Sequence, residues 1–242
     1  MKIMGFQELT LIDYPGKLAC TLFLYGCNFR CGFCHNPELV LSVKEEKNEK
    51  GYSEEEILRF LEKRKGQLEG VCITGGEPLL TIDLEFLQKI KDLGYLIKID
   101  TNGSFPELLE ELIKKGLVDY IAMDIKASKA NYEKLINAKI DINKIEKSIE
   151  IISSLLEEYE FRTTVLEDGN FHNKDEIKEI AQWLNKIHPE KGKPKKFVLQ
   201  GFKNKGKFID TSFNSKKDTS QEYLEELKSL LEKYFEEVET RA

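Results

Sequence analysis

Short β-rich runs alternate with longer amphipathic segments along nearly the whole chain, and this alternation is the strongest constraint on its fold. The expected strands cover 19–25, 70–74, 95–101, 118–124, 159–166 and 196–200. The expected helices cover 53–65, 82–93, 106–115, 142–157, 174–187 and 220–235, and the first carries a capping box of Ser53 and Glu56. Repeated strand–helix units require a parallel sheet with right-handed crossovers. Six units are too few for a closed eight-stranded barrel, so we expect an α/β fold with an open, curved parallel sheet, a partial (β/α)6 barrel.

The length of 242 residues allows one large α/β domain or two small ones. Because the alternation hardly breaks, we expect a single domain over 1–242. Within it, we expect an N-terminal extension at 1–18, a core at 19–200 and a C-terminal loop and helix at 201–242.

Composition excludes several classes of protein. A net charge of −6 argues against general nucleic-acid binding, which needs a basic field. We find no apolar run of the roughly 18–20 residues that span a bilayer and no secretory leader, so we expect a cytoplasmic protein without a membrane partner. Five cysteines, three of them within eight residues, indicate a metal or redox site in a reducing compartment and not a secreted disulfide framework.

Polar or glycine-rich residues recur where the expected strands end. In folds of this kind the reactive groups gather at the carboxyl edge of the sheet, so this recurrence indicates a shared site. The residues are Gly26 with the cysteine loop, the Gly75-Gly76-Glu77-Pro78 turn, Asp100 to Gly103, Asp124 to Lys126 and Gln200, with Arg162 inside its own strand.

The cysteine loop, Cys27-x3-Cys31-x2-Cys34, follows the first expected strand directly. Thiolates bind iron–sulfur clusters or zinc. Three ligands on a four-iron cluster leave one iron open, whereas a fourth cysteine would close the cluster for electron transfer. The alternative is a structural zinc site completed by His35. It is disfavoured because His35 is adjacent to Cys34 and zinc ligands usually come as two separated pairs.

Other conspicuous residues have ordinary interpretations. Cys20 and Cys72 lie inside expected strands and are expected to be small buried hydrophobes. His172 and His188 are expected to be surface residues. Seven lysines in 191–207 are interpreted as solvated loops, with a docking patch for an acidic partner as the alternative, and 44–50 is expected to be a solvated surface loop.

The motifs together resemble a known family. GCNFRCGFCHNPE (26–38) is similar to the cluster loop of radical S-adenosylmethionine (SAM) proteins, and specifically of the activases of glycyl-radical enzymes. TGGEP (74–78), DTNG (100–103) and MDIK (123–126) follow in the family's order at expected strand ends. The opening segment, 5–31, is most similar to activators of anaerobic ribonucleoside-triphosphate reductase. The resemblance therefore implies the radical SAM type of partial barrel.

The resemblance also implies roles for individual residues. Cys27, Cys31 and Cys34 would hold a 4Fe-4S cluster, with Phe33 and His35 beside SAM. Gly75 and Gly76 would let the backbone approach the methionyl group, and Glu77 would accept from its ammonium. On this view a valine at Gly76 weakens SAM binding and leaves the cluster intact.

Further roles fall on the later strand ends. Asp124 and Lys126 would help hold SAM, and Asp100, Thr101 and Asp124 would ligate a monovalent cation, the alternative being a surface ion pair. Arg162 would bind the SAM carboxylate or form a structural salt bridge. The family's late SAM-site histidine has no match, so Gln200 or nearby backbone would take its place.

The implied reaction is reductive cleavage of SAM to a 5'-deoxyadenosyl radical that abstracts hydrogen from a glycine of a partner glycyl-radical enzyme. Reduced flavodoxin or ferredoxin would supply the electron. The chain lacks the cysteine-rich ferredoxin-like insertion of many activases, which indicates the compact subgroup. The alternatives are a radical SAM enzyme acting on a small molecule or another protein, and a noncatalytic metal-binding interaction protein, which the joint motifs nearly exclude.

Overall fold

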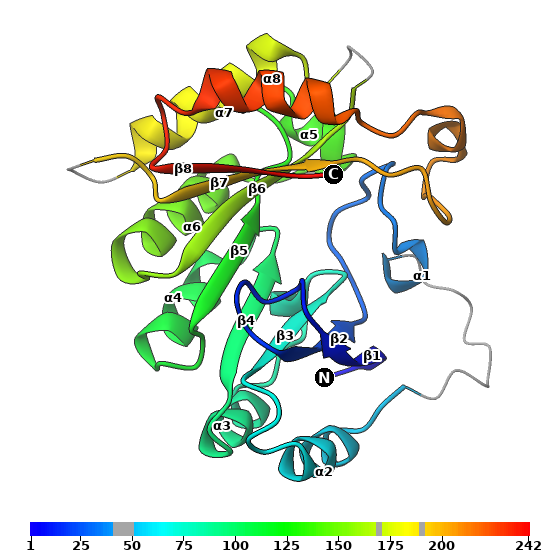
Figure 1. Ribbon diagram of the computed structural model, residues 1–242, viewed down its shortest axis with the longest axis vertical. Coiled ribbons are helices and arrows are strands. Elements are labelled where there is room, and N and C mark those ends of the chain that lie inside the picture. Colours follow the sequence, from blue (N-terminus) through cyan, green and yellow to red (C-terminus); the bar gives the residue numbers. More distant parts are fainter. Residues whose placement is uncertain (41–50, 168–170, 189–191) are drawn as a thin grey trace.

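The computed structural model describes residues 1–40, 51–167, 171–188 and 192–242. Its strands form one eight-stranded sheet in chain order, with β1 antiparallel to β2 and every later pair parallel. The strands are β1 (Ile3–Thr10), β2 (Ala19–Leu24), β3 (Gly70–Gly75), β4 (Leu96–Thr101), β5 (Tyr120–Asp124), β6 (Tyr159–Val165), β7 (Lys196–Gly201) and β8 (Glu237–Arg241). The expected open, curved and mostly parallel sheet is confirmed (Figure 1).

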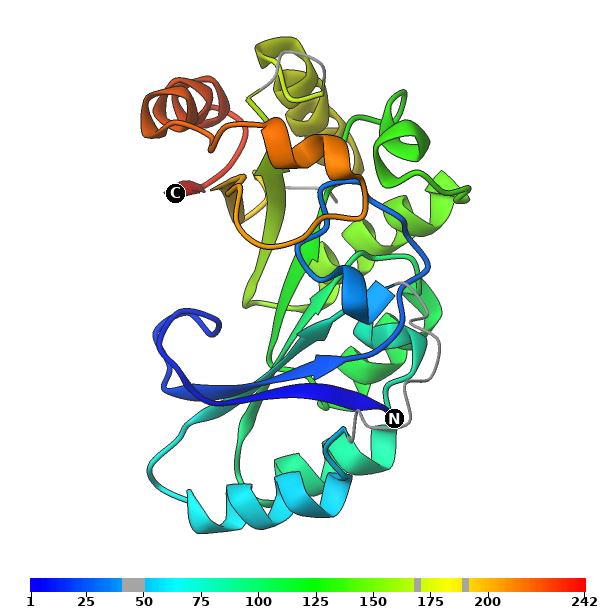
Figure 2. The ribbon, with the colours of Figure 1, turned by 90° about the vertical axis from the view of Figure 1, so that its right-hand side faces the viewer.

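Helices cover the outer, convex side of the sheet, and the segment between β2 and α1 crosses its inner side (Figures 1 and 2). The six expected helices are α2 (Glu54–Lys63), α3 (Leu84–Asp92), α4 (Pro106–Lys114), α6 (Ile142–Leu155), α7 (Lys174–Ile187) and α8 (Gln221–Leu231). Short helices occur at α1 (Pro37–Val40) and α5 (Tyr132–Ile136), and 3-10 turns at Pro78–Leu80 and Thr211–Ser215. The capping box at the start of α2 is confirmed, since Ser53 and Glu56 each accept the other's backbone N–H.

Alternation along the strands separates an apolar face from a polar one. In β4, Ile97 and Ile99 belong to the main core under the helices, whereas Lys98 and Asp100 occupy the alternate positions. The convex face is stabilised by burial of aliphatic side chains, each contributing about 1.5–3 kcal/mol. The concave face is therefore free to carry charge.

Two strands were not expected from the sequence. β1 lies in the segment predicted to be an extension, and β8 follows the C-terminal helix. β8 is only five residues long and carries charges at Glu237, Glu239 and Arg241, as edge strands often do, so its pattern is weak. Arg241 nevertheless reaches across β7 and donates twice to the buried Glu160 of β6, at 2.8 Å each.

No helix within the described ranges is long and apolar enough to cross a membrane.

Candidate active site

A cavity of about 490 Å³ opens at the carboxyl edge of the strands, a size typical of small-molecule sites. Of the residues expected at the shared site, Gly26, Pro78, Gly103 and Ile125 do not line the cavity. Those given a role toward the cluster, SAM or a cation all line it, as does Gln200: Cys27, Cys31, Phe33, Cys34, His35, Gly75, Gly76, Glu77, Asp100, Thr101, Asp124, Lys126 and Arg162. Parallel pairing explains the convergence, because Leu24 is in register with Gly75 and Asp124 with Arg162. Strand ends far apart in sequence thus share one edge.

The cysteine loop is tied to the neighbouring turn through its backbone. Gly26 lies two residues beyond the end of β2 and has a φ of 99°, a conformation that favours glycine. Its carbonyl accepts from the N–H of Glu77 at 2.7 Å, and its own N–H donates to Leu39 at 2.8 Å. Arg30 donates to the Cys27 carbonyl at 2.6 Å. These bonds fix where the three free thiols enter the cavity.

The thiols are held in a desolvated environment. Burial raises the pKa of Cys27 to about 11 and that of Cys31 to about 12, and it also raises the pKa of Cys34. A metal centre that needs thiolates must therefore displace their protons when it binds. The positive charge of Lys126 acts in the opposite direction on all three thiols.

The glycine turn packs against the cysteine loop. A Cβ at Gly76 would lie 2.0 Å from the Gly26 carbonyl oxygen, and one at Gly75 would lie 2.3 Å from the backbone of Leu24. The requirement for glycine thus comes from contact between the two loops. A valine at Gly76 would displace the cysteine loop itself, contrary to the expectation that the cluster loop would be unaffected.

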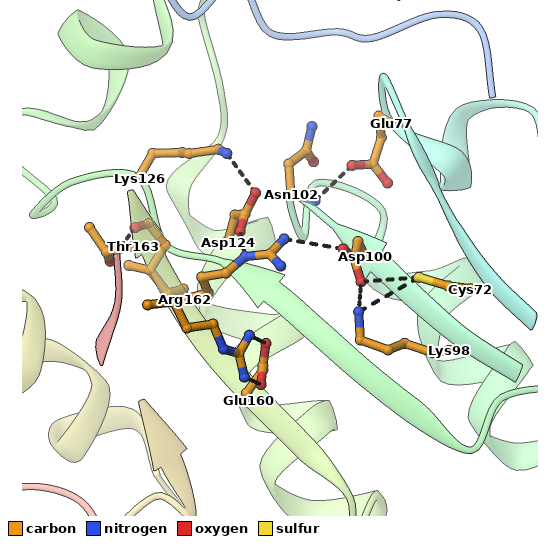
Figure 3. Close-up of polar contacts among 12 residues, drawn as sticks. Cys72, Glu77, Lys98, Asp100, Asn102, Asp124, Lys126, Glu160, Arg162 and Thr163 are labelled. Carbon is orange, nitrogen blue, oxygen red and sulfur yellow. Dashed lines mark hydrogen bonds and ion pairs between the residues drawn. The ribbon is translucent and has the colours of Figure 1, made fainter. Parts of the chain in front are cut away.

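Glu77 is fully buried and accepts three hydrogen bonds. The N–H of Asn102 donates at 2.7 Å (Figure 3). The hydroxyl of Thr101 donates at 2.7 Å and the N–H of Leu79 at 3.1 Å. Burial raises the pKa of Glu77 to about 7, although these donors favour the ionised form. The carboxyl group therefore lies near the balance between its two protonation states at neutral pH.

A chain of ion pairs crosses the concave face (Figure 3). Asp124 accepts from Arg162 Nε at 2.7 Å and from Lys126 Nζ at 2.7 Å. Arg162 also reaches Asp100 at 3.3 Å, and Asp100 pairs with Lys98. Burial opposes charge on Asp124, but Arg162 and Lys126 hold its pKa well below the usual range. Arg162 was expected either to bind the SAM carboxylate or to form a structural salt bridge. In the structure it forms a salt bridge with Asp124.

A segment after β7 covers the cysteine loop. The His35 ring lies 5.6 Å from that of Phe202 and 5.2 Å from that of Phe208, and its Nε2 is 2.7 Å from the Lys203 carbonyl. Phe33 contacts Phe213 at a centroid separation of 6.1 Å. This aromatic cover holds the two residues that were predicted to flank SAM.

Comparison with known proteins decides the family. A model of the radical SAM superfamily matches residues 21–184. The chain belongs to the radical SAM superfamily.

Relatives place this radical SAM protein in the glycyl-radical-enzyme activating family. A Methanocaldococcus jannaschii protein provisionally named as a glycyl-radical enzyme activating enzyme is 32% identical over 99% of this chain and 95% of its own length. A pyruvate formate-lyase-activating enzyme of Listeria monocytogenes is 32% identical over 52% of this chain and 53% of its own.

Solved radical SAM structures support the fold. SuiB of Streptococcus suis, solved with bound SAM, has a TM-score of 0.66 at 16% identity. The match covers 92% of this chain and 52% of SuiB, so this chain spans about half of that protein. QueE of Escherichia coli has a TM-score of 0.52 at 16% identity, covering 82% of this chain and 83% of QueE. At these identities the likeness concerns the fold alone.

The residues present fit the cluster that the radical SAM family uses. Three free cysteines line one cavity, and a cubane cluster binds each thiolate at a different iron. In the alternative zinc site, His35 would be the fourth ligand, but its Nε2 lies 2.7 Å from the Lys203 carbonyl oxygen.

The other cysteines and histidines differ in how far they are buried. Cys20 and Cys72 are fully buried, as predicted. The expectation for His172 was wrong: it is fully buried, because its ring bridges Leu166 and Lys126, and His188 is half-buried. The loop expected at 44–50 lies outside the described residues.

The lysine-rich segment is divided by β7. Lys195 and Lys196 lie at the amino end of that strand, away from the cavity, and pair with Glu158 and with Glu237 and Glu239 respectively. Lys203 lines the cavity. Lys191 is not among the described residues. A docking patch on the cavity side would therefore involve only the lysines after β7.

Two residues near the site, Asp13 and Lys98, were not expected there from the sequence, and Asn102 was expected there only as a member of the DTNG turn, without a role of its own. Asp13 and Asn102 line the cavity, and Asn102 donates from its side chain to Asn28 of the cysteine loop at 2.9 Å. Asn102 lies inside the DTNG motif, so the motif itself indicates that this residue is near the site. Lys98 carried no such signal, since a lone lysine in a strand usually faces solvent.

Proposed function

We propose that this radical SAM protein forms a glycyl radical on a partner enzyme, using a 4Fe-4S cluster on Cys27, Cys31 and Cys34. The observation that carries the proposal is the meeting of three free thiols with the Asp124–Lys126–Arg162 ion pairs in one cavity. The full-length relative supports the type of target. The single sheet supports treating 1–242 as one domain, and the free thiols fit a reducing cytoplasm.

When bound, the cluster and SAM supply the chemistry: one-electron cleavage of SAM yields methionine and a 5'-deoxyadenosyl radical that takes hydrogen from glycine. The protein's contribution is binding and orientation. Lys126 presents its ammonium beside the thiols, where it suits the carboxylate or ribose of SAM. Glu77 accepts from the SAM ammonium when it is ionised. Phe33 and His35 exclude water from this side.

The partner we favour is anaerobic ribonucleoside-triphosphate reductase. Support comes from the resemblance of 5–31 to activators of that reductase. This segment includes β1 and the loop after it, and the loop brings Asp13 to the cavity. Pyruvate formate-lyase is the competing partner, because activating enzymes of that lyase match half of the chain. The electron would come from reduced flavodoxin or ferredoxin. The two cysteines outside the cysteine loop, Cys20 and Cys72, are fully buried and do not offer a second cluster that could relay it.

Isotope transfer tests the proposal. The partner is labelled with deuterium at glycine Cα and incubated anaerobically with the reconstituted protein, SAM and reductant. We expect deuterium in 5'-deoxyadenosine, measured by mass spectrometry, and none with a Cys31→Ala variant. Unlabelled 5'-deoxyadenosine with both reductase and lyase, together with label uptake from a small metabolite, would instead support a radical SAM enzyme acting on a small molecule.

A further inference from the structure

The carboxylates that the resemblance assigns to a monovalent cation already have cationic partners. Each of the four carboxylate oxygens of Asp100 and Asp124 faces a nitrogen of Lys98, Arg162 or Lys126 (Figure 3). Both carboxylates are mostly buried, with side-chain exposures of 14% and 21%. A metal ion would have to displace one of these partners in order to bind.

The third assigned ligand does not point to the same place. The Thr101 hydroxyl donates to Glu77 at 2.7 Å and accepts from the N–H of Gly103 at 3.1 Å. Its oxygen is thus occupied within the turn that follows β4. The three residues Asp100, Thr101 and Asp124 therefore do not fit a metal ion in this arrangement.

Lys98 is built into the concave face. It is 2% exposed and lies two residues before Asp100 on β4, so both side chains project to the same side. Its neighbours in register are Cys72 on β3 and Tyr120 on β5, and its Nζ lies 3.8 Å from the Cys72 sulfur and 5.9 Å from the centre of the Tyr120 ring. Its ammonium is thus held in an ion pair with the Asp100 carboxylate.

The charge balance also disfavours an added cation. The chain of ion pairs contains three cations, Lys98, Arg162 and Lys126, and two anions, Asp100 and Asp124. Its formal charge is therefore 3 − 2 = +1. A metal cation at Asp100 or Asp124 would lie beside the three cations that already pair with these carboxylates, and their repulsion in a desolvated region is unfavourable.

We propose that the ammonium of Lys98 takes the place of a monovalent metal ion at Asp100, so that this protein binds SAM without Na⁺ or K⁺. Lys98 acts as a positioning residue: it neutralises Asp100, which in turn holds Arg162 against Asp124. This inference rests on SAM binding in the proposed function, but the ion requirement is measured separately.

The first test uses the wild-type protein with its cluster and needs no variant. Equilibrium dialysis with radioactive Rb⁺, a K⁺ analogue, should detect no bound ion, with or without SAM. SAM affinity should be the same in KCl, NaCl and choline chloride at equal ionic strength. Stoichiometric Rb⁺, or SAM affinity that falls about tenfold in choline, would overturn the proposal. Absence of SAM binding in every salt would instead count against the proposed function. The Rb⁺ measurement would still decide whether Lys98 replaces a metal ion.

The second test creates the ion requirement. Lys98→Ala opens space beside Asp100, so SAM affinity should fall by about tenfold or more in choline and recover in KCl, with Rb⁺ now retained. Lys91→Ala removes a matched lysine from its 2.7 Å pair with Asp119 outside the cavity and should change neither property. A Lys98→Ala protein that is folded, binds SAM normally in choline and retains no Rb⁺ would contradict the proposal. If that variant does not fold, the wild-type measurements decide.

Discussion

His172 holds the backbone of Lys126 in place. The N–H of Leu166 donates to Nδ1 of His172 at 3.1 Å, so the proton of the neutral ring is on Nε2, which donates to the Lys126 carbonyl at 2.8 Å. The ring is fully buried. It thereby links the residue just beyond β6 to Lys126, which lies two residues beyond β5. His172 itself does not line the cavity, so it acts on the site through Lys126.

Replacing this ring should weaken SAM binding. His172→Ala leaves two buried backbone groups without their partner, which costs on the order of 1–3 kcal/mol in the free energy of unfolding and releases Lys126. We expect lower SAM affinity by calorimetry as well as a lower midpoint of thermal unfolding. Tyr95→Phe removes a buried 2.7 Å hydrogen bond to Leu61 far from the cavity, and should lower the midpoint alone. Wild-type SAM affinity in a folded His172→Ala protein would contradict the positioning role.

The cluster should depend on three cysteines only. Anaerobic reconstitution should give about four irons and four sulfides per chain, because three thiolates anchor a cubane. Alanine at Cys27, Cys31 or Cys34 should abolish it, whereas alanine at the buried Cys20 or Cys72 should not. Iron and sulfide analysis with the visible absorption spectrum provides the measurement, and stoichiometric zinc without that absorption would overturn the assignment.

Gly76 should matter for the cluster as well as for SAM. In Gly76→Val the new Cβ meets the Gly26 carbonyl at 2.0 Å, so the cysteine loop must move and iron content should fall. Gly94→Ala is the control. Its φ of 91° is unfavourable for a residue with a side chain, but the new Cβ would meet no atom within 4 Å. It should lower thermal stability and leave iron content unchanged. Full iron content in Gly76→Val would show that the two loops tolerate separation.

Stability should fall as the pH rises through neutrality because of Glu77. Its pKa is raised from 4.5 to about 7 by burial, so the native state binds the proton more tightly than the unfolded state. The contribution is complete below about pH 4.5 and is lost as pH passes about 7, with an upper limit of about 3 kcal/mol. Urea unfolding of the cluster-free protein at about pH 5.5, inside this range, and at about pH 8, roughly one unit above its upper end, should show the loss. Glu77→Gln should flatten it, and an equal slope in both proteins would exclude Glu77 as the source.

The sequence predicted the sheet and most of the site because both follow from local patterns. A parallel strand buried on both faces is visible as an apolar run, and motif residues directly after such runs meet at one edge, as Asp100 and Asp124 do. β8 was not predicted, since five residues with three charges carry little strand signal.

Other features depend on long-range contacts and could not be predicted. His35 meets the Lys203 carbonyl across 168 residues of sequence. His172 is buried between the residues that follow β5 and β6, and Lys98 is buried between Cys72 and Tyr120 of the neighbouring strands. Gly75 and Gly76 were expected to matter because of a bound ligand, but the atoms that demand glycine belong to Leu24 at the end of β2 and to Gly26 in the loop beyond it.

Electron paramagnetic resonance on the partner enzyme tests the central claim most directly. Reconstituted, reduced protein is incubated anaerobically with SAM and ribonucleoside-triphosphate reductase, and in parallel with pyruvate formate-lyase. The account predicts a persistent glycine-centred radical on one partner without any small-molecule substrate, absent with Cys27→Ala protein. Consumption of SAM to 5'-deoxyadenosine with no glycyl radical on either partner would contradict it.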